Sequence, residues 1–148
     1  MSSKLDVEIA GIKLSNPTML ASGILGISAA TLKEAAKHGA GAVVTKSVGL
    51  KPRDGYPNPT IVQVECGLIN AMGLPNPGIH NFLDEVAEAK ECGVPVFISI
   101  YGSSPEEFAE VARVASGSVA DALELNVSCP HVKGLGAEIG CDPRMVSR

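Results

Sequence analysis

The sequence predicts an α/β fold in which short buried strands alternate with helices. Four short runs of the 148-residue chain are almost continuously apolar, which is typical of parallel strands buried on both faces. A segment with helical spacing follows each of the first three runs, and repeats of about 25 residues fit βα units. The four predicted strands are Thr18–Ala21, Ala42–Thr45, Val94–Ile100 and Ala122–Leu125.

A small hairpin is predicted ahead of the first of these strands. Val7–Ala10 and Ile12–Leu14 are short, largely apolar segments that flank Gly11. Glycine reaches the backbone conformations that tight turns require. We expect an antiparallel pair that closes one end of the sheet.

The first two helices are predicted from their apolar spacing and from the glycine that follows each. The first spans about Ser28–His38 and is followed by Gly39, where a helix end favours a left-handed residue. The second spans about His80–Cys92, and Gly93 ends it in the same way.

The third helix has the clearest start signal. Ser104 precedes Pro105 at the first helical position, and Glu107 stands three residues after the serine, which is a capping-box pattern. The apolar residues then recur at helical spacing. They are Phe108, Val111, Ala112 and Ala115.

The second βα unit is much longer than the others. Residues 49–78 intervene between its strand and its helix, and Ile61–Glu65 within them could form a hairpin strand. Connections of this length inside a compact domain are usually functional.

The four units amount to half of a (β/α)₈ barrel, also called a TIM barrel. We interpret residues 1–148 as one unit of this kind, with Asp142–Pro143 at the start of a fourth helix. The alternative is an open sheet of four strands. In either case the first and fourth strands leave apolar edges without a neighbour, and such edges promote association.

Composition excludes several classes of function. A net charge of −4, 3% aromatic residues and no Trp argue against a nucleic-acid surface. No apolar run is long enough to span a membrane, and Met1–Glu8 lacks the apolar segment of a signal peptide, so we expect a cytoplasmic protein. The cysteines show no Cys-x-x-Cys spacing, which makes a disulfide framework unexpected. They are Cys66, Cys92, Cys129 and Cys141.

Polar or small residues stand at the carboxyl end of every predicted strand. One polar residue after a strand is ordinary turn chemistry. Four sets in the same position are more informative, because these strand ends meet at the face of a βα barrel where active sites form. The residues are Ser22 and Gly23, then Thr45, Lys46 and Ser47, then Ser99 and Tyr101, and finally Asn126, Ser128 and Cys129.

Two segments near these ends suggest ligand binding. Lys46 directly follows the buried pair Val43–Val44, so its side chain must either extend to solvent or meet an anion. Asn70–Gly78 combines glycines and prolines, which fix a backbone, with asparagines, which offer paired donors and acceptors. The alternatives are a solvated lysine and a plain turn-rich loop.

The segment after the fourth strand carries a thiol. Cys129 lies just past the strand end, and Pro130 stiffens the backbone beside it. This cysteine is either inert or a reactive group. Cys129, His131 and Cys141 could supply three metal ligands, but their spacing matches no zinc pattern, and we expect no metal site. The Gly23–Gly26 turn is too loose for a dinucleotide fingerprint.

These segments together resemble the class 1 dihydroorotate dehydrogenases along nearly the whole chain. The resemblance implies a (β/α)₈ barrel with FMN at its C-terminal face, which oxidises dihydroorotate to orotate in pyrimidine biosynthesis. The segments that carry it are Asn16–Pro17 leading to Ala21–Gly23, Thr45–Ser47, the Asn70–Gly78 loop, and Asn126-x-Ser128-Cys129-Pro130.

The class and the subclass are indicated by separate features. Cys129 places the chain in class 1, because the other class has serine there, and the loop, with Ala71 and Pro77, resembles subclass 1B more than 1A. Membership of 1B implies a partner subunit with FAD and an iron–sulfur cluster, electron transfer to NAD, and a homodimer of the barrel subunit.

The resemblance also implies a role for each matching residue. Cys129 would be the general base, and a thiol titrates at about 8.5, near enough to neutral pH for this work. The FMN contacts would be Ser22, Thr45, Lys46, Ser47, Ser99 and Asn126. The dihydroorotate contacts would be Lys46, Asn70, Ala71, Met72, Gly73, Leu74 and Asn126. Ser99 departs from the 1B pattern, which usually has asparagine there.

The family is about twice as long as this chain. Its later strands carry a further flavin-contacting lysine and the glycine-rich loops that bind the FMN phosphate. We therefore expect this polypeptide by itself to bind FMN weakly and to turn over little. The alternatives are a related flavin barrel acting on another dihydropyrimidine, and a non-catalytic half barrel that only self-associates.

Overall fold

The computed structural model describes residues 4–130 and 132–148, and its centre is a parallel sheet of four strands. The strands β3 (Met19–Leu20), β4 (Ala42–Val44), β7 (Val96–Ile100) and β8 (Ala122–Leu125) lie in that order across the sheet. All three pairings are parallel, as predicted. The first three strands are shorter than the predicted ranges.

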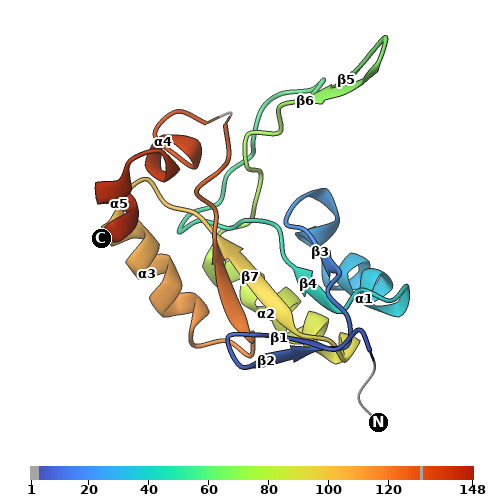
Figure 1. The fold of residues 1–148 in the computed structure, drawn as a ribbon. Coiled ribbons are helices and arrows are strands. Elements are labelled where there is room, and N and C mark those ends of the chain that lie inside the picture. The colour runs from blue at the N-terminus through green and yellow to red at the C-terminus, as the bar shows by residue number, and fades with distance from the viewer. Residues whose placement is uncertain (1–3, 131) are drawn as a thin grey trace.

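Three helices cover one face of this sheet, as Figure 1 shows. They are α1 (Ala29–Lys37), α2 (Ile79–Ala89) and α3 (Pro105–Ala115), in the predicted order. A 3₁₀ turn, η1 (Ile24–Ile27), leads into α1, and another, η2 (Lys90–Cys92), extends α2. The βα alternation expected from the sequence is therefore confirmed.

The predicted helix ends are also found. Ser104 accepts a hydrogen bond from the Glu107 N–H at 3.2 Å, and Gly93 is left-handed with φ 77°. One detail of the predicted capping box differs. The Glu107 carboxylate accepts from the N–H of Ser103, at 2.7 Å, instead of that of Ser104.

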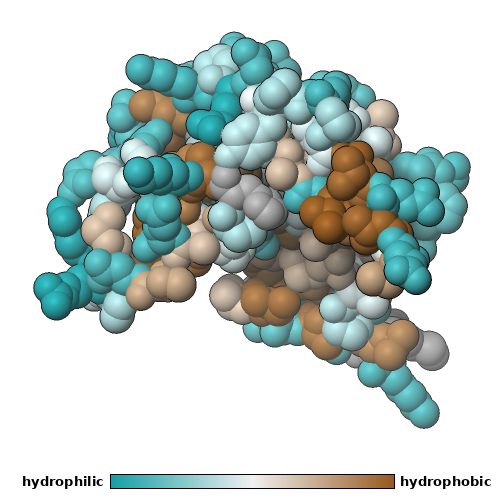
Figure 2. All heavy atoms as spheres, turned by 90° about the horizontal axis from the view of Figure 1, so that it is seen from above, coloured by the Kyte–Doolittle hydropathy of each residue, from teal (hydrophilic) through white to brown (hydrophobic). Residues whose placement is uncertain are grey.

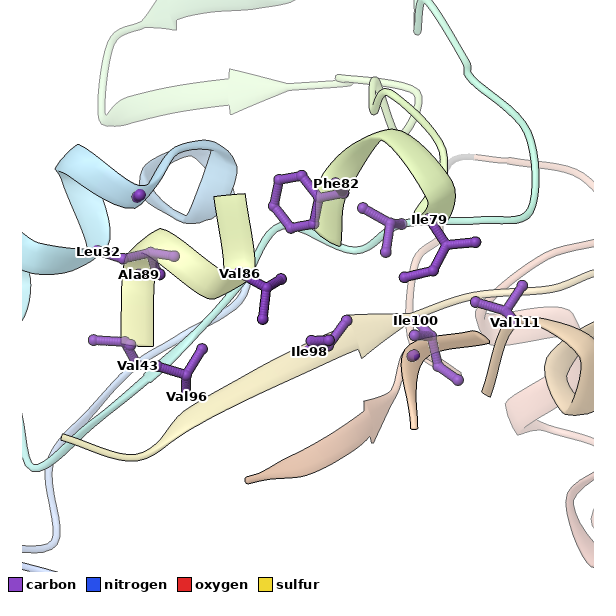
Figure 3. Packing of buried hydrophobic residues seen from close by; sticks show 13 residues of the cluster. Leu32, Val43, Ile79, Phe82, Val86, Ala89, Val96, Ile98, Ile100 and Val111 are labelled. Carbon is purple, nitrogen blue, oxygen red and sulfur yellow. The ribbon is translucent and has the colours of Figure 1, made fainter. Parts of the chain in front are cut away.

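The main hydrophobic core lies between the helices and the sheet (Figure 3). Val43 of β4 and Ile98 of β7 point toward α2, which contributes Phe82 and Val86. All four side chains are buried almost completely. Burying side chains of this size contributes roughly 1.5–3 kcal/mol each, which makes this layer the main source of stability.

The predicted N-terminal hairpin covers the opposite face of the sheet at its lower end (Figure 1). The strands β1 (Val7–Ile9) and β2 (Ile12–Leu14) pair in antiparallel fashion. Leu14 is buried in a second small core with Ala42, Val44 and Phe97. The hairpin thus closes the end of the sheet that is remote from the strands' carboxyl ends.

The long insert forms a hairpin that projects from the body (Figure 1). The strands β5 (Ile61–Val64) and β6 (Gly67–Asn70) pair in antiparallel fashion, and every residue in both is exposed. The sequence predicts the first of these strands but not its partner, because Gly67–Asn70 lacks an alternating pattern.

The two outer strands correct one expectation. Runs of continuous apolar sequence predict burial on both faces, but β3 is only half-buried and Leu125 of β8 is 57% exposed. The reason is that each is an edge strand with one open side. The sheet is therefore open, as a partial barrel requires.

Two short helices, α4 (Ala137–Gly140) and α5 (Pro143–Ser147), end the chain. Asp142 caps α5 by accepting from the Arg144 N–H at 2.9 Å, so the predicted fourth helical start is found. In the part of the chain that is described, every helix is too short or too polar to cross a bilayer.

Candidate active site

A cavity of about 700 Å³ lies at the carboxyl ends of the strands. Most of the residues predicted to form a site line it. They are Ser22, Lys46, Ser47, Asn70, Met72, Gly73, Leu74, Asn126 and Cys129. Seen from above, hydrophilic residues cover most of the surface, with apolar patches between them (Figure 2).

Lys46 is the one ammonium group among the described residues that line this cavity. It is 7% exposed, so its side chain does not extend to bulk solvent as the alternative required. No carboxylate of the described residues forms an ion pair with it. Burial lowers the pKa of Lys46, and the charge of the Cys129 thiolate partly offsets this. A buried cation without a protein counter-ion favours an anionic ligand in the cavity.

Ser47 connects the ends of all four strands. Its hydroxyl lies 3.1 Å from the Ser22 hydroxyl and 2.9 Å from that of Ser99. It also accepts a hydrogen bond from the Asn126 side-chain amide at 2.8 Å. These bonds hold the polar groups of separate strands at fixed positions before any ligand arrives.

Three predicted contact residues do not reach the cavity. Thr45 is fully buried. It lies two residues after Val43, so its side chain points to the same face of the sheet, toward the helices. Its hydroxyl accepts a hydrogen bond from the Ser99 N–H at 3.1 Å. Ser99 is also fully buried and contacts the cavity only through Ser47. Ala71 lies beside the cavity wall without forming part of it.

Asn126 fixes the backbone that carries the thiol. Its Oδ1 accepts from the N–H groups of Ser128, at 3.3 Å, and Cys129, at 3.2 Å. Its Nδ2 donates to Ser47, so one side chain joins the strand ends to the cysteine loop. Cys129 is half-buried and lines the same cavity as Lys46.

Two glycines, Gly26 in the turn after β3 and Gly136, which the sequence analysis did not single out, allow these backbones to approach one another. A Cβ at Gly26 would lie 2.4 Å from the backbone nitrogen of Lys46, and one at Gly136 would lie 2.4 Å from the backbone carbonyl oxygen of Cys129. Gly26 also accepts from the Lys46 N–H at 2.7 Å. Only the three-dimensional packing shows these requirements, since neither glycine belongs to a recognisable motif.

Glu124 is a further missed residue. It lies on β8 and lines the cavity, on the same side of the strand as Ala122. A signal was present in the sequence, because a charged residue in an otherwise apolar strand has to face an opening. The cavity therefore contains both a cation and an exposed carboxylate.

The Asn70–Gly78 loop forms one wall of the cavity. Its carbonyl groups at Met72 and Gly73 are bound by the Tyr56 N–H, at 3.0 Å, and by Arg53 Nε, at 2.7 Å. Within the described residues, the N–H groups of Met72, Gly73 and Leu74 donate to no protein acceptor. Successive free N–H groups in a turn suit a carboxylate or carbonyl oxygen.

The set of metal ligands considered from the sequence, Cys129, His131 and Cys141, is only partly described by the structure. The described residues contain no group of three or more His, Cys, Asp and Glu side chains arranged to hold a metal ion. His131, the middle member of the alternative ligand set, lies outside the described residues. All four cysteines are free thiols.

The fold and the cavity define a class: part of a βα barrel with a polar site at the carboxyl ends of its strands. The chain belongs to the dihydroorotate dehydrogenase family, whose family model matches residues 4–147. This family is a flavin-dependent group of (β/α)₈ barrels, so the predicted fold class and family are both confirmed.

Curated relatives place the chain more narrowly. It is 54% identical over 144 residues to the "dihydroorotate dehydrogenase B (NAD(+)), catalytic subunit" of Pyrococcus furiosus. The subunits with the same name from Methanocella arvoryzae and Pyrococcus abyssi are 53% and 55% identical over 143 and 142 residues. These matches cover 96–97% of this chain, and the expected 1B subclass agrees with the names.

The chain spans about half the length of these relatives. Each match covers 47% of the relative's sequence. The four βα units described above therefore correspond to one half of the related subunits.

Proposed function

We propose that this chain provides the dihydroorotate-oxidising half of an FMN-dependent dihydroorotate dehydrogenase of subclass 1B. The observation that carries the proposal is the convergence of Lys46, Asn126 and Cys129 with the Asn70–Gly78 loop on one cavity. The product, orotate, would feed pyrimidine biosynthesis in the cytoplasm.

The residues present fit the flavin ring. Lys46 is buried without a protein counter-ion, and such a cation suits a ring system that takes up negative charge. The hydroxyl groups of Ser22 and Ser47 and the amide of Asn126 supply neutral hydrogen-bonding groups on the same wall. When bound, FMN supplies the two-electron acceptor for the hydride that leaves the substrate.

The chain's own chemistry would be proton removal. The Cys129 thiolate takes a proton from one ring carbon of dihydroorotate and becomes a thiol. Deprotonation leaves the electron pair of the broken C–H bond on that carbon, where it forms the new C=C double bond as a hydride leaves the adjacent ring carbon. Asn126 holds the Cys129 backbone during this step. Lys46 lines the same cavity as Cys129, so its positive charge lies on the wall that faces the substrate.

Substrate orientation would come from the loop wall. The free N–H groups of Met72, Gly73 and Leu74 suit the orotate carboxylate and ring carbonyls, while the Asn70 side chain offers both a donor and an acceptor. Ala71 shapes this loop and is not proposed to touch the ring.

The relatives' names as "catalytic subunit" support a multi-subunit enzyme. We propose that the whole protein forms a homodimer and passes electrons to NAD through a separate FAD and iron–sulfur subunit.

A second candidate function is self-association without catalysis. It is favoured by the open edges β3 and β8 and by the exposed apolar hairpin, in which Leu68 is 71% exposed. Sedimentation of the chain would reveal concentration-dependent oligomers if this is its role, and a flavin absorbance spectrum would separate the two candidates.

The proposal is tested by supplying the missing half in trans. The unmatched half of the Pyrococcus furiosus subunit is expressed together with this chain, and dihydroorotate oxidation is measured with FMN and a dye acceptor. Cys129→Ala should lower kcat at neutral pH by about 10²-fold or more, the usual contribution of a general base.

Cys66→Ala is the matched control, because Cys66 is an exposed thiol in the turn of the β5–β6 hairpin, away from the cavity lining. Its activity should equal that of the unaltered chain. Equal rates for Cys129→Ala and Cys66→Ala would remove the base assignment. Dihydrouracil, offered in place of dihydroorotate, checks for a different dihydropyrimidine.

A further inference from the structure

Asn76 is the one asparagine of the Asn70–Gly78 loop that is buried, at 7% exposure. Its Nδ2 donates to the Leu74 carbonyl at 2.8 Å and to the Tyr101 hydroxyl at 2.9 Å. Its Oδ1 accepts from the Gly78 N–H at 2.9 Å and the Gly49 N–H at 3.3 Å. A primary amide has two donors and two acceptor lone pairs, so its full hydrogen-bonding capacity is used.

These four bonds join three separate segments. Leu74 and Gly78 belong to the loop, Gly49 follows β4, and Tyr101 follows β7. The backbone of Asn76 also exchanges both of its hydrogen bonds with Arg53, at 2.8 and 2.9 Å. Asn76 therefore anchors the loop to the strand ends that carry the cavity.

The anchored backbone is one that the loop would not adopt freely. Leu74 has φ 56°, a left-handed backbone conformation that is uncommon for residues other than glycine, and Gly73 has φ 75°. The surrounding structure has to impose such a conformation. The bond from Asn76 to the Leu74 carbonyl is one of the contacts that hold it.

We propose that Asn76 is a positioning residue, which holds the backbone of Met72, Gly73 and Leu74 so that their N–H groups stay available to the substrate anion. Asn76 does not line the cavity and so acts without touching the ligand. This inference rests on the proposed function, since it names how the substrate wall of that same site is kept in shape.

The test uses the ¹⁵N-labelled chain and two variants. Asn76→Asp keeps the acceptor atom but loses both donors, and Asn76→Ala loses all four bonds. Tyr101→Phe is the matched control, because it removes only one of the four. Backbone order parameters for residues 72–74 are measured first without ligand. Orotate is then titrated into each protein at millimolar concentration.

In the unaltered chain we expect order parameters near 0.85 for this loop, falling below about 0.6 in Asn76→Asp and Asn76→Ala. Orotate affinity should fall about tenfold or more in both, with a smaller loss in Tyr101→Phe. Amide shifts of β4 and β7 should stay unchanged, which separates loop positioning from general unfolding.

Two results overturn the inference: a loop that stays equally ordered in Asn76→Ala, or an unchanged orotate affinity despite a disordered loop. Failure of the proposed function looks different. In that case orotate causes no shifts at Met72–Leu74 even in the unaltered chain, while the order parameters still respond to the substitution.

Discussion

The two faces of the central sheet differ in how the polarity of their side chains changes along the strands. The helix-covered face is apolar from Val43 and Val96 to Ile98 and Ile100, with the buried Thr45 as a polar residue near its carboxyl end. The opposite face begins with Ala42 and other apolar residues against the N-terminal hairpin. It ends in the polar residues of the cavity.

This difference follows from the alternation of side chains along a strand. Neighbouring residues such as Val44 and Thr45 point to opposite sides, so each strand can contribute to a core and to a site at once. The helix face carries the main apolar core, and the other face carries the polar residues that line the cavity at its carboxyl end. Substitutions on the two faces should therefore have separable effects on unfolding and on binding.

The largest expected effect on stability is on the helix face. Ile98→Ala should lower the free energy of unfolding by about 2–5 kcal/mol, because it leaves a cavity in a fully buried position. Denaturant unfolding followed by circular dichroism measures this. Leu68→Ala, in the exposed hairpin, should change it by less than about 0.5 kcal/mol. Similar losses at both positions would contradict the assignment of the core.

A smaller loss is expected where the backbone beneath Lys46 is tightly packed. Gly26→Ala places a Cβ 2.4 Å from the backbone nitrogen of Lys46 and should lower the free energy of unfolding by about 1–3 kcal/mol. It should also weaken orotate binding, because Lys46 has to shift. Gly117→Ala is the control, since the nearest atom there lies at 3.3 Å. Equal melting temperatures for both variants would refute the close approach.

Removing the Ser47 hydroxyl should both lower the free energy of unfolding and disturb the arrangement of the cavity residues. Ser47→Ala removes a group bonded to Ser22, Ser99 and Asn126, at a cost of about 1–2 kcal/mol. The backbone amide chemical shift of Cys129 should change as well, because Asn126, which accepts from the Cys129 N–H, loses its hydrogen bond to Ser47. A spectrum in which only residues next to position 47 change would show that the strand ends are not coupled.

The smallest stability change should be favourable. Lys46→Met removes a buried charge without a counter-ion and should raise the free energy of unfolding by about 1 kcal/mol while abolishing orotate binding. Thermal unfolding and an orotate titration measure the two effects. A variant that is both less stable and still able to bind would overturn the role given to Lys46.

The same lysine predicts a pH dependence. Burial lowers the pKa of Lys46, so between its folded and unfolded pKa values the unfolded chain binds more protons. The free energy of unfolding should therefore receive a contribution from Lys46 that rises with pH in the alkaline range below its usual value of 10.5. Lys46→Met should lack this contribution, which comparison of the two proteins across that range would show.

The sequence predicts much of this arrangement because its signals are local. Apolar runs, helix caps such as Ser104, and the polar residues after each strand all depend on near neighbours in the chain. Strand parity could also have shown that Thr45 faces the helices with Val43. The distant contacts could not be predicted: the approach of Gly136 to Cys129, and the anchoring of the loop to Tyr101 by Asn76, appear only when separate segments pack together.

The most direct measurement is a titration of the ¹⁵N-labelled chain with FMN and orotate together at millimolar concentrations. If strand ends from separate units form one flavin and pyrimidine site, the amides of Lys46, Asn70, Asn126 and Cys129 should shift with a common saturation curve. Shifts confined to one of these segments, or none at all, would contradict the account.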